Sequence, residues 1–173
     1  MLISVEQIPS EEGLHLAGTL AATGNLGRDH ELSLPGPIAF SVRLRRQEDR
    51  VELDGWLHTV ARVNCSRCLE QAPRTVEREF QICSRPQEAM PSERAVELDV
   101  RDLDVDYYPG DSLDLSAILV EQVLLDLPMK LLCSEECRGL CPRCGANRNR
   151  HDCECDPVGD PRLAPLGGLR DRA

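Results

Sequence analysis

Six of the nine cysteines in this chain lie within the short stretch from Cys133 to Cys155. Thiols at this density require either oxidation to disulfides or a bound metal ion. The centre of the stretch, Cys141-Pro142-Arg143-Cys144-Gly145, has the form of a zinc knuckle, in which a tight turn lets two thiolates bind one ion. We expect Gly145 to free the backbone so that amide N–H groups point at the sulfurs. The stretch therefore predicts a metal site.

The spacing leaves open which cysteines share an ion. In one arrangement, two separate sites form. The last four cysteines of the tail make one site, which consists of Cys141, Cys144, Cys153 and Cys155. The first two cysteines of the tail join the earlier pair in the other site, which consists of Cys133, Cys137, Cys65 and Cys68. A second arrangement leaves the last pair out and uses Cys133, Cys137, Cys141 and Cys144.

His151 offers a further alternative, because thiolates two positions apart strain to reach the same ion and His151 could replace Cys153 or Cys155. In every version the cofactor is structural Zn2+, one or two ions, since four protein ligands leave no open position for an activated water. If eight cysteines are used, Cys83 is left as a lone thiol on a strand.

The earlier pair, Cys65-Ser66-Arg67-Cys68, lies between two expected strands at the tip of a hairpin. It is read either as half of a metal site or as the redox pair of a thiol–disulfide oxidoreductase. A redox pair of the thioredoxin type opens a helix after a strand, where the helix dipole stabilises the thiolate. The flanks here are antiparallel strands, which favours metal binding and leaves the oxidoreductase as the alternative.

The charge of the chain is unevenly distributed. Residues 1–127 contain 12 Arg and 23 Asp or Glu, a net charge of −11, whereas residues 128–173 contain 8 Lys or Arg and 7 Asp or Glu, a net charge of +1. The acidic region 1–127 does not have the charge needed to bind along a nucleic acid, and it better fits a basic protein partner. A local RNA or partner contact through the tail would use Arg138, Arg143, Arg148 and Arg150.

Targeting signals are not evident in the sequence. The chain has no run of eighteen apolar residues, and its first residues lack the basic and apolar regions of a signal peptide. These features predict a cytoplasmic protein with reduced cysteines and no membrane contact.

Alternating apolar residues predict the elements that must position the cysteines. Three strands are expected at about 38–45, 51–63 and 74–83, with a further acidic strand or pair of strands over 96–107. Asp114 is expected to cap a helix whose apolar stripe is Leu115, Ile118, Leu119, Val123 and Leu124. The fold class is therefore α+β: an antiparallel meander or barrel-like sheet packed with one main helix, plus a small Cys-rich zinc-knuckle tail.

Three regions follow from this pattern: a β-rich domain with the helix over 1–127, a Cys-rich zinc-binding tail over 128–156, and a disordered terminus over 157–173.

The order of three motifs resembles the YceD family of large ribosomal RNA subunit accumulation proteins. The motifs are Val63 to Glu70, Leu113 to Lys130, and Leu132 to Asn147, within a match of about 38–155; the usual Asn-Leu-Asn after the knuckle is here Asn147-Arg148-Asn149. The resemblance implies a non-enzymatic role in accumulation of large-subunit ribosomal RNA, hence in assembly of the large ribosomal subunit. A large-subunit ribosomal protein or pre-ribosomal particle is the implied partner, and no catalytic residue or small-molecule substrate is implied. The residues likewise offer no nucleophile elbow, phosphate loop or His-rich site.

Overall fold

The computed structural model describes residues 1–21, 24–26, 32–48, 50–89, 105–155 and 162. It divides the chain into two compact units. Unit 1 contains residues 1–63 and 73–129, and unit 2 contains residues 64–72 and 130–173. The hairpin tip with Cys65 and Cys68 therefore groups with the Cys-rich tail, although the strands that lead to it belong to unit 1. The predicted regions 1–127 and 128–156 stay predictions, and 157–173 lies outside the described residues apart from Arg162.

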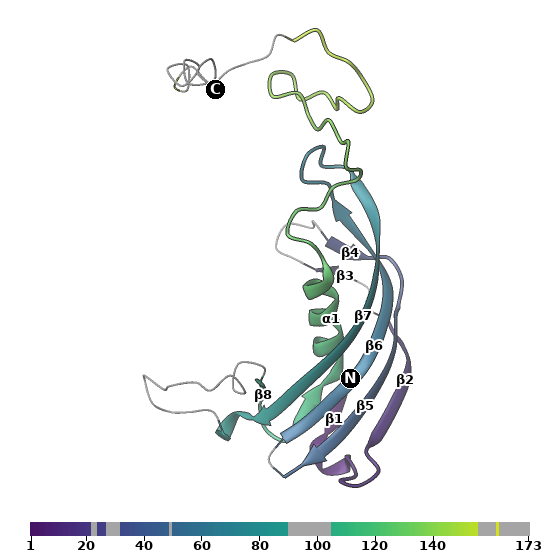
Figure 1. The fold of residues 1–173 in the computed structure, drawn as a ribbon, viewed down its shortest axis with the longest axis vertical. Helices are drawn as coiled ribbons and strands as arrows, with labels where there is room; N and C mark the ends of the chain where they lie inside the picture. Colours follow the sequence, from purple (N-terminus) through teal and green to yellow (C-terminus); the bar gives the residue numbers. More distant parts are fainter. Residues whose placement is uncertain (22–23, 27–31, 49, 90–104, 156–161, 163–173) are drawn as a thin grey trace, which may run out of the picture. The chain divides into compact units, whose positions relative to one another are not determined.

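Unit 1 is rich in strands and contains one α-helix in its described part (Figure 1). The elements in chain order are β1 (Leu2–Ser4), the 3-10 turn η1 (Val5–Gln7), β2 (Leu14–Leu20), β3 (Gly24–Leu26), β4 (Leu32–Leu34), β5 (Ile38–Gln47), β6 (Arg50–Asn64), β7 (Gln71–Pro86), the 3-10 turn η2 (Gln87–Ala89), β8 (Val105–Tyr108), β9 (Ser112–Asp114) and α1 (Leu115–Asp126). The three long strands expected from the alternation are β5, β6 and β7.

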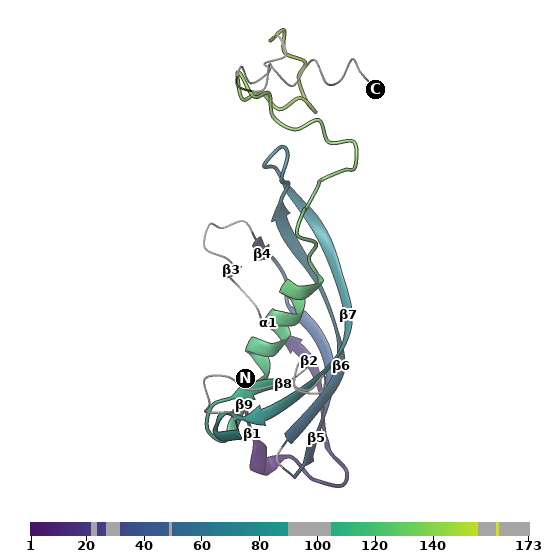
Figure 2. The ribbon, with the colours of Figure 1, turned by 60° about the vertical axis from the view of Figure 1, so that its left-hand side comes forward.

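In the described part of the chain, seven strands form one open sheet, so the expectation of a barrel-like sheet is wrong. β6 is central and pairs with β5, β4 and β7; β2 extends the sheet beyond β5, and β8 extends it beyond β7. Among the described strands, the edge strands β2 and β8 are not paired with each other, so this sheet does not close. β1 and β9 form a separate two-stranded ribbon at the N-terminal end of α1 (Figure 2).

The sheet is also not purely antiparallel, because β8 runs parallel to β7 with Cys83 opposite Val105. Parallel neighbours need a connection of about a dozen or more residues. The chain between Pro86 and Val105 is long enough to return the strand in the same direction. Of the acidic strand expected over 96–107, only residues 105–107 fall within the described part, and they belong to β8.

The core lies on one face of the sheet, as the alternation predicts. Val42 and Leu44 of β5 and Leu53 and Leu57 of β6 are fully buried, whereas Trp56 on the opposite face of β6 is 46% exposed. Burying such aliphatic side chains contributes about 1.5–3 kcal/mol each relative to leaving them in water. This face is the one that α1 covers (Figures 1 and 2).

Helix α1 begins at the expected cap. Asp114 Oδ1 accepts hydrogen bonds from the backbone N–H groups of Ser116 (3.0 Å) and Ala117 (3.4 Å). The predicted stripe is wrong at Leu124, which is 45% exposed, while Gln122 is buried in its place. The polar Gln122 is tolerated there because Arg78 Nε of β7 donates to its Oε1 at 3.0 Å. No helix in the described part of the chain has the length and apolar character needed to cross a membrane.

Candidate metal centres

Unit 2 brings four cysteines from two distant parts of the chain together, and we call them the first cluster. Cys65 and Cys68 come from the hairpin tip between β6 and β7, and Cys133 and Cys137 follow α1; their four Sγ atoms all lie within 4.8 Å of one another. Cys65, Cys68 and Cys137 are 1%, 3% and 4% exposed, and Leu132 packs against them. Three of the four cysteines therefore form a small buried core, and the fourth, Cys133, is exposed.

The tail alone supplies the second cluster. Cys141, Cys144, Cys153 and Cys155 have their Sγ atoms within 4.8 Å of one another, and Cys141 is the most buried of the four. Of the two arrangements that the spacing allows, the structure thus brings together the pair of separate four-cysteine sets. It does not bring Cys133 and Cys137 into one set with Cys141 and Cys144.

Backbone hydrogen bonds shape the second knuckle around Gly145. Gly145 adopts φ +74°, and its N–H donates to the carbonyl of Cys141 at 2.9 Å. The N–H of Cys141 in turn donates to the carbonyl of Ala146 at 2.8 Å. Closing the turn in this way leaves the backbone N–H groups of Arg143 and Cys144 directed at the Cys141 sulfur.

The hairpin tip repeats this turn. Leu69 adopts φ +61°, its N–H donates to the carbonyl of Cys65 at 2.9 Å, and the N–H of Cys65 donates to the carbonyl of Glu70 at 2.9 Å. The N–H of Arg67 lies 3.5 Å from the Cys65 sulfur. The two Cys-x-x-Cys segments are therefore built alike, one on a hairpin and one in a tail.

The sulfur positions fit a tetrahedral zinc ion. Cys65 Sγ lies 3.7 Å from Cys137 Sγ, and Cys68 Sγ lies 3.7 Å from Cys133 Sγ. Four thiolates about 2.3 Å from one Zn2+ stand about 3.8 Å apart along the edges of a tetrahedron. A disulfide would require sulfurs about 2.0 Å apart, and all nine cysteines are unpaired thiols. Each cluster could thus hold one metal ion through four soft ligands.

The thiols of each cluster have strongly divided proton affinities. The pKa of Cys141 is lowered to about 6, first by the backbone N–H groups of Cys144 and Arg143. Burial raises the pKa of Cys65, yet backbone N–H groups, led by that of Cys133, bring it down to about 6.

Their neighbours shift the other way. The pKa of Cys133 is raised to about 12, chiefly by its contact with Cys137, and that of Cys155 to about 12, chiefly by its contact with Cys144. Crowded thiols resist joint ionisation because thiolates repel one another. A cation bound between the sulfurs would relieve that repulsion.

The tip and the tail are locked together around Arg67. Its guanidinium donates to the carbonyl of Cys137 at 2.8 Å and to that of Glu135 at 3.3 Å. Its own carbonyl accepts the N–H of Leu140 at 3.0 Å. Gly139, at φ +72°, has no room for a side chain because a Cβ there would lie 2.9 Å from the Arg67 carbonyl oxygen.

The other predicted residues take varied positions. His151 is exposed and belongs to neither cluster. Cys83 lies on β7 outside both clusters.

At least three of the four predicted contact arginines have an interaction within the described part of the chain. Arg138 pairs with Asp152 at 2.7 Å and Arg150 with Glu70 at 2.8 Å, while Arg148 is exposed. Arg143 is also exposed and has an interaction of its own.

Sequence reasoning did not identify Leu69 or Arg67 as parts of the metal centre. A signal for Leu69 existed, since it stands one position after the second cysteine of its pair, as Gly145 does.

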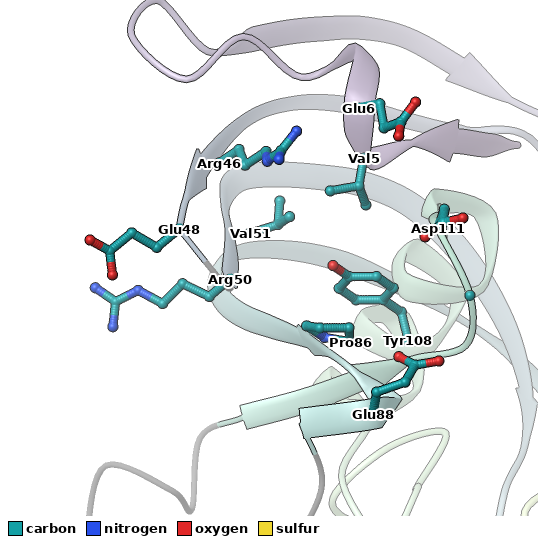
Figure 3. A pocket seen from close by; sticks show the side chains of 11 residues that line it. Val5, Glu6, Arg46, Glu48, Arg50, Val51, Pro86, Glu88, Tyr108 and Asp111 are labelled. Atoms are coloured by element: carbon teal, nitrogen blue, oxygen red, sulfur yellow. The ribbon is translucent and has the colours of Figure 1, made fainter.

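Unit 1 has a separate cavity of about 220 Å³ beside the β5–β6 turn. Figure 3 shows Arg46 and Arg50 on its rim together with Glu6, Glu48 and Glu88, and the Tyr108 ring within. Asp111 also lines it, so carboxylates outnumber the two arginines, but both signs of charge are present and no cluster of metal-binding or nucleophilic groups is found among its lining residues. The chemistry of the molecule is concentrated in the cysteine clusters.

These features define an acidic, sheet-rich protein with two candidate four-cysteine metal centres. Residues 53–170, which include all eight clustered cysteines, match the family model described as "Large ribosomal RNA subunit accumulation protein YceD", and the chain belongs to the YceD family.

Two curated relatives have the same printed name, "Large ribosomal RNA subunit accumulation protein YCED homolog 1, chloroplastic". The protein from Zea mays is 30% identical over 176 residues, covering 88% of this chain and 57% of the relative. The protein from Arabidopsis thaliana is 26% identical over 164 residues, covering 79% of this chain and 49% of the relative. The chain thus spans about half the length of the curated relatives it matches. No solved structure matches it, and the cytoplasmic location of this chain stays a prediction.

Proposed function

We propose that this chain is a non-enzymatic factor for accumulation of large-subunit ribosomal RNA that acts in assembly of the large ribosomal subunit. Membership of the YceD family is the observation that carries the proposal. The two relatives are named for accumulation of large ribosomal RNA, which supports the same role here. In this proposal each cysteine cluster binds one structural Zn2+, and the ions fold unit 2 into a rigid contact module.

Four thiolates around each ion argue for a structural role of the metal. A catalytic zinc keeps one position for water or substrate, whereas four protein ligands fill the tetrahedron. The zinc would supply folding energy to a unit whose described residues have little apolar core beyond Leu132 and the buried cysteines.

A thiol–disulfide oxidoreductase that uses Cys65 and Cys68 is not favoured. Cys65 Sγ and Cys68 Sγ each have a sulfur of the tail at 3.7 Å, so the pair is not an isolated dithiol. The tip leads from β6 to β7 rather than to a helix N-terminus, so no helix dipole is available to it.

The charge of the described surface favours a basic protein of the large subunit as the direct partner. Unit 1 has a groove of about 720 Å³ between β7, β8 and α1, lined by Glu79, Asp106 and Glu121 together with apolar Phe80 and Leu125. Its cation, Arg78, is occupied by Gln122 and by Asp126. Such a groove suits a lysine- or arginine-rich segment.

An RNA contact through the tail has less support. Arg138 and Arg150 each form an ion pair with a carboxylate, and a phosphate would have to compete with that carboxylate for the arginine. RNA therefore remains the second possibility for the direct partner.

The function is tested by replacing the gene with variants in the source cell and measuring the ratio of large- to small-subunit ribosomal RNA. Deletion, and a Cys68→Ser/Cys141→Ser variant that breaks both clusters, should lower the ratio and reduce large subunits on sucrose gradients. Cys83→Ser is the matched control because it removes a thiol outside both clusters. An unchanged ratio after deletion would refute the proposed role.

The partner is tested separately, by co-purification with large-subunit particles at increasing salt. Glu79→Gln/Glu121→Gln should weaken retention if the groove binds a basic protein, whereas Glu11→Gln/Glu12→Gln, in an exposed turn, should not. Loss in Arg143→Gln/Arg148→Gln instead, with the groove variant unaffected, would point to RNA.

A further inference from the structure

Asn149 belongs by sequence to the second cluster but contacts the first. It lies in the segment between Cys144 and Cys153, which joins the two halves of the second cluster. Its side-chain Nδ2 donates to Cys137 Sγ of the first cluster at 3.2 Å. Its Oδ1 accepts the backbone N–H of Arg138 at 2.7 Å, so both ends of the amide are used.

Further hydrogen bonds hold the Asn149 segment on the chain that leaves the first cluster. The N–H of Asn149 donates to Asn147 Oδ1 at 2.9 Å, which sets the local turn. The N–H of Arg148 donates to the carbonyl of Gly139 at 2.9 Å, and Leu140 and Asn147 form an isolated β-bridge. The amide of Asn149 is therefore positioned by backbone contacts rather than by its own flexibility.

An N–H donor directed at a ligating thiolate orients the sulfur and stabilises its charge. Removal of such a partner typically lowers metal affinity about 10- to 100-fold. The segment that carries this donor is anchored at both ends by second-cluster cysteines, so its conformation depends on whether that cluster is closed.

We propose that Asn149 is a positioning residue that couples the two metal sites, because closure of the second cluster places its amide on the Cys137 sulfur of the first. The inference rests on the zinc binding of the proposed function and goes beyond it by making the two ions interdependent. Binding at either site then favours binding at the other by the same factor, as thermodynamic linkage requires.

The test is a Co2+ titration of the reduced, metal-free full chain, competed with a chelator and followed through thiolate-to-cobalt absorption. Native mass spectrometry counts the ions, and alkylation with peptide mapping identifies the protected cysteines.

Asn149→Asp keeps an oxygen for the Arg138 N–H but places a carboxylate oxygen against the sulfur. It should lower the affinity of the first cluster about 10- to 100-fold. Arg148→Gln is the matched control because it changes a neighbouring side chain but keeps the backbone hydrogen bond from position 148 to the carbonyl of Gly139. It should leave the metal affinity of the first cluster unchanged. Asn149→Ala, which removes both contacts, should change the affinity in the same direction as Asn149→Asp.

A double-variant cycle separates coupling from local damage. In a Cys153→Ser/Cys155→Ser background the first cluster should already be weakened, and Asn149→Asp should then add little. Conversely, Cys65→Ser/Cys68→Ser should weaken the second cluster by a similar factor.

Two outcomes would overturn the inference: an unchanged first-cluster affinity in Asn149→Asp, or full additivity in the cycle. If two ions bind but do so independently, the coupling is refuted while the zinc part of the proposed function stands. A wild-type chain that binds no ion would defeat the zinc part of the proposed function together with the coupling.

Discussion

Leu69 occupies in the hairpin tip the position that Gly145 occupies in the tail. Each residue follows the second cysteine of its pair, adopts a left-handed φ of +61° or +74°, and donates its N–H to the carbonyl of the first cysteine at 2.9 Å. Glycine meets this conformation without strain, whereas a side chain with a Cβ does not. The tip therefore accepts a strained leucine to form the same turn around sulfur.

Leu69→Gly should tighten metal binding at the first cluster. Relief of the left-handed strain is worth about 1 kcal/mol, or roughly fivefold in affinity. Leu69 is 64% exposed, so little apolar burial is lost. Chelator competition measures the change. Leu69→Ala is the control because it removes the side chain but keeps the strain; an equal gain in that variant would show that the strain is not the cause.

Gly139→Ala should loosen the tip from the tail and weaken the first cluster. The added Cβ would lie 2.9 Å from the Arg67 carbonyl oxygen, and the φ of +72° adds backbone strain. We expect about a tenfold loss of first-cluster affinity, for a combined cost of about 1.4 kcal/mol or more. Gly110→Ala is the matched control, since it has a φ of +63° with open space around it. Equal metal affinity in the two variants would contradict the inference that the close contact between Gly139 and Arg67 holds the hairpin tip against the tail.

Metal removal should unfold unit 2 and leave unit 1 folded. Trp56 is the only tryptophan and lies on β6 in unit 1, so its emission reports on that unit alone. Under reducing conditions a chelator should leave this emission unchanged while trypsin gains access to Arg138, Arg143 and Arg148. Chelator saturated beforehand with zinc is the control. Continued protection of the tail after complete metal loss would show that its fold does not need the ion.

Asp114 should stabilise unit 1 in a pH-dependent way. Its pKa is lowered, first by a hydrogen bond from the N-terminal ammonium and also by the N–H groups of Ala117 and Ser116, against the opposing effect of burial. A lowered pKa in the folded state means that the contribution is complete above the unfolded pKa of about 4 and is lost as the pH falls through the folded value.

Urea unfolding of the wild type, Asp114→Ala and Asp114→Asn as a function of pH tests this prediction. Asp114→Ala should cost about 1 kcal/mol at pH 7 through loss of the cap. Asp114→Asn keeps an oxygen acceptor without the charge, so the advantage of the wild type over it should shrink below pH 4. A constant difference across the pH range would assign the effect to the cap geometry alone.

The alternation of apolar residues predicted β5, β6 and β7 because one face of each is buried against the core. The same alternation does not specify the partner or direction of a strand, so the parallel pairing of β8 with β7 was missed. Leu124 was misassigned because an apolar helical residue fits a stripe even when the sheet does not reach it, and Gln122 took the buried place through its bond to Arg78.

The cysteine spacing predicted metal sites but allowed two groupings. Only the folded hairpin brings Cys65 and Cys68 to Cys133 and Cys137, which is a tertiary relationship that no local spacing encodes. Leu69 was missed for a different reason: its position after the second cysteine matches that of Gly145, but leucine disfavours the left-handed region, so its residue type argues against the turn that it makes.

The first cluster joins Cys68 to Cys133, which are 65 positions apart along the chain. An ion held by both cysteines closes a loop that contains β7, β8, β9 and α1. In an unfolded chain the entropy of closing a loop of this size costs about 4 kcal/mol. Once the enclosed segment has folded, the two cysteines are already close together and this entropy is no longer lost on metal binding. The first cluster should therefore bind its ion about a thousandfold more tightly in the folded chain than in the unfolded chain. At limiting metal concentration, an ion at this cluster would therefore be found mainly in chains whose segment between Cys68 and Cys133 has folded.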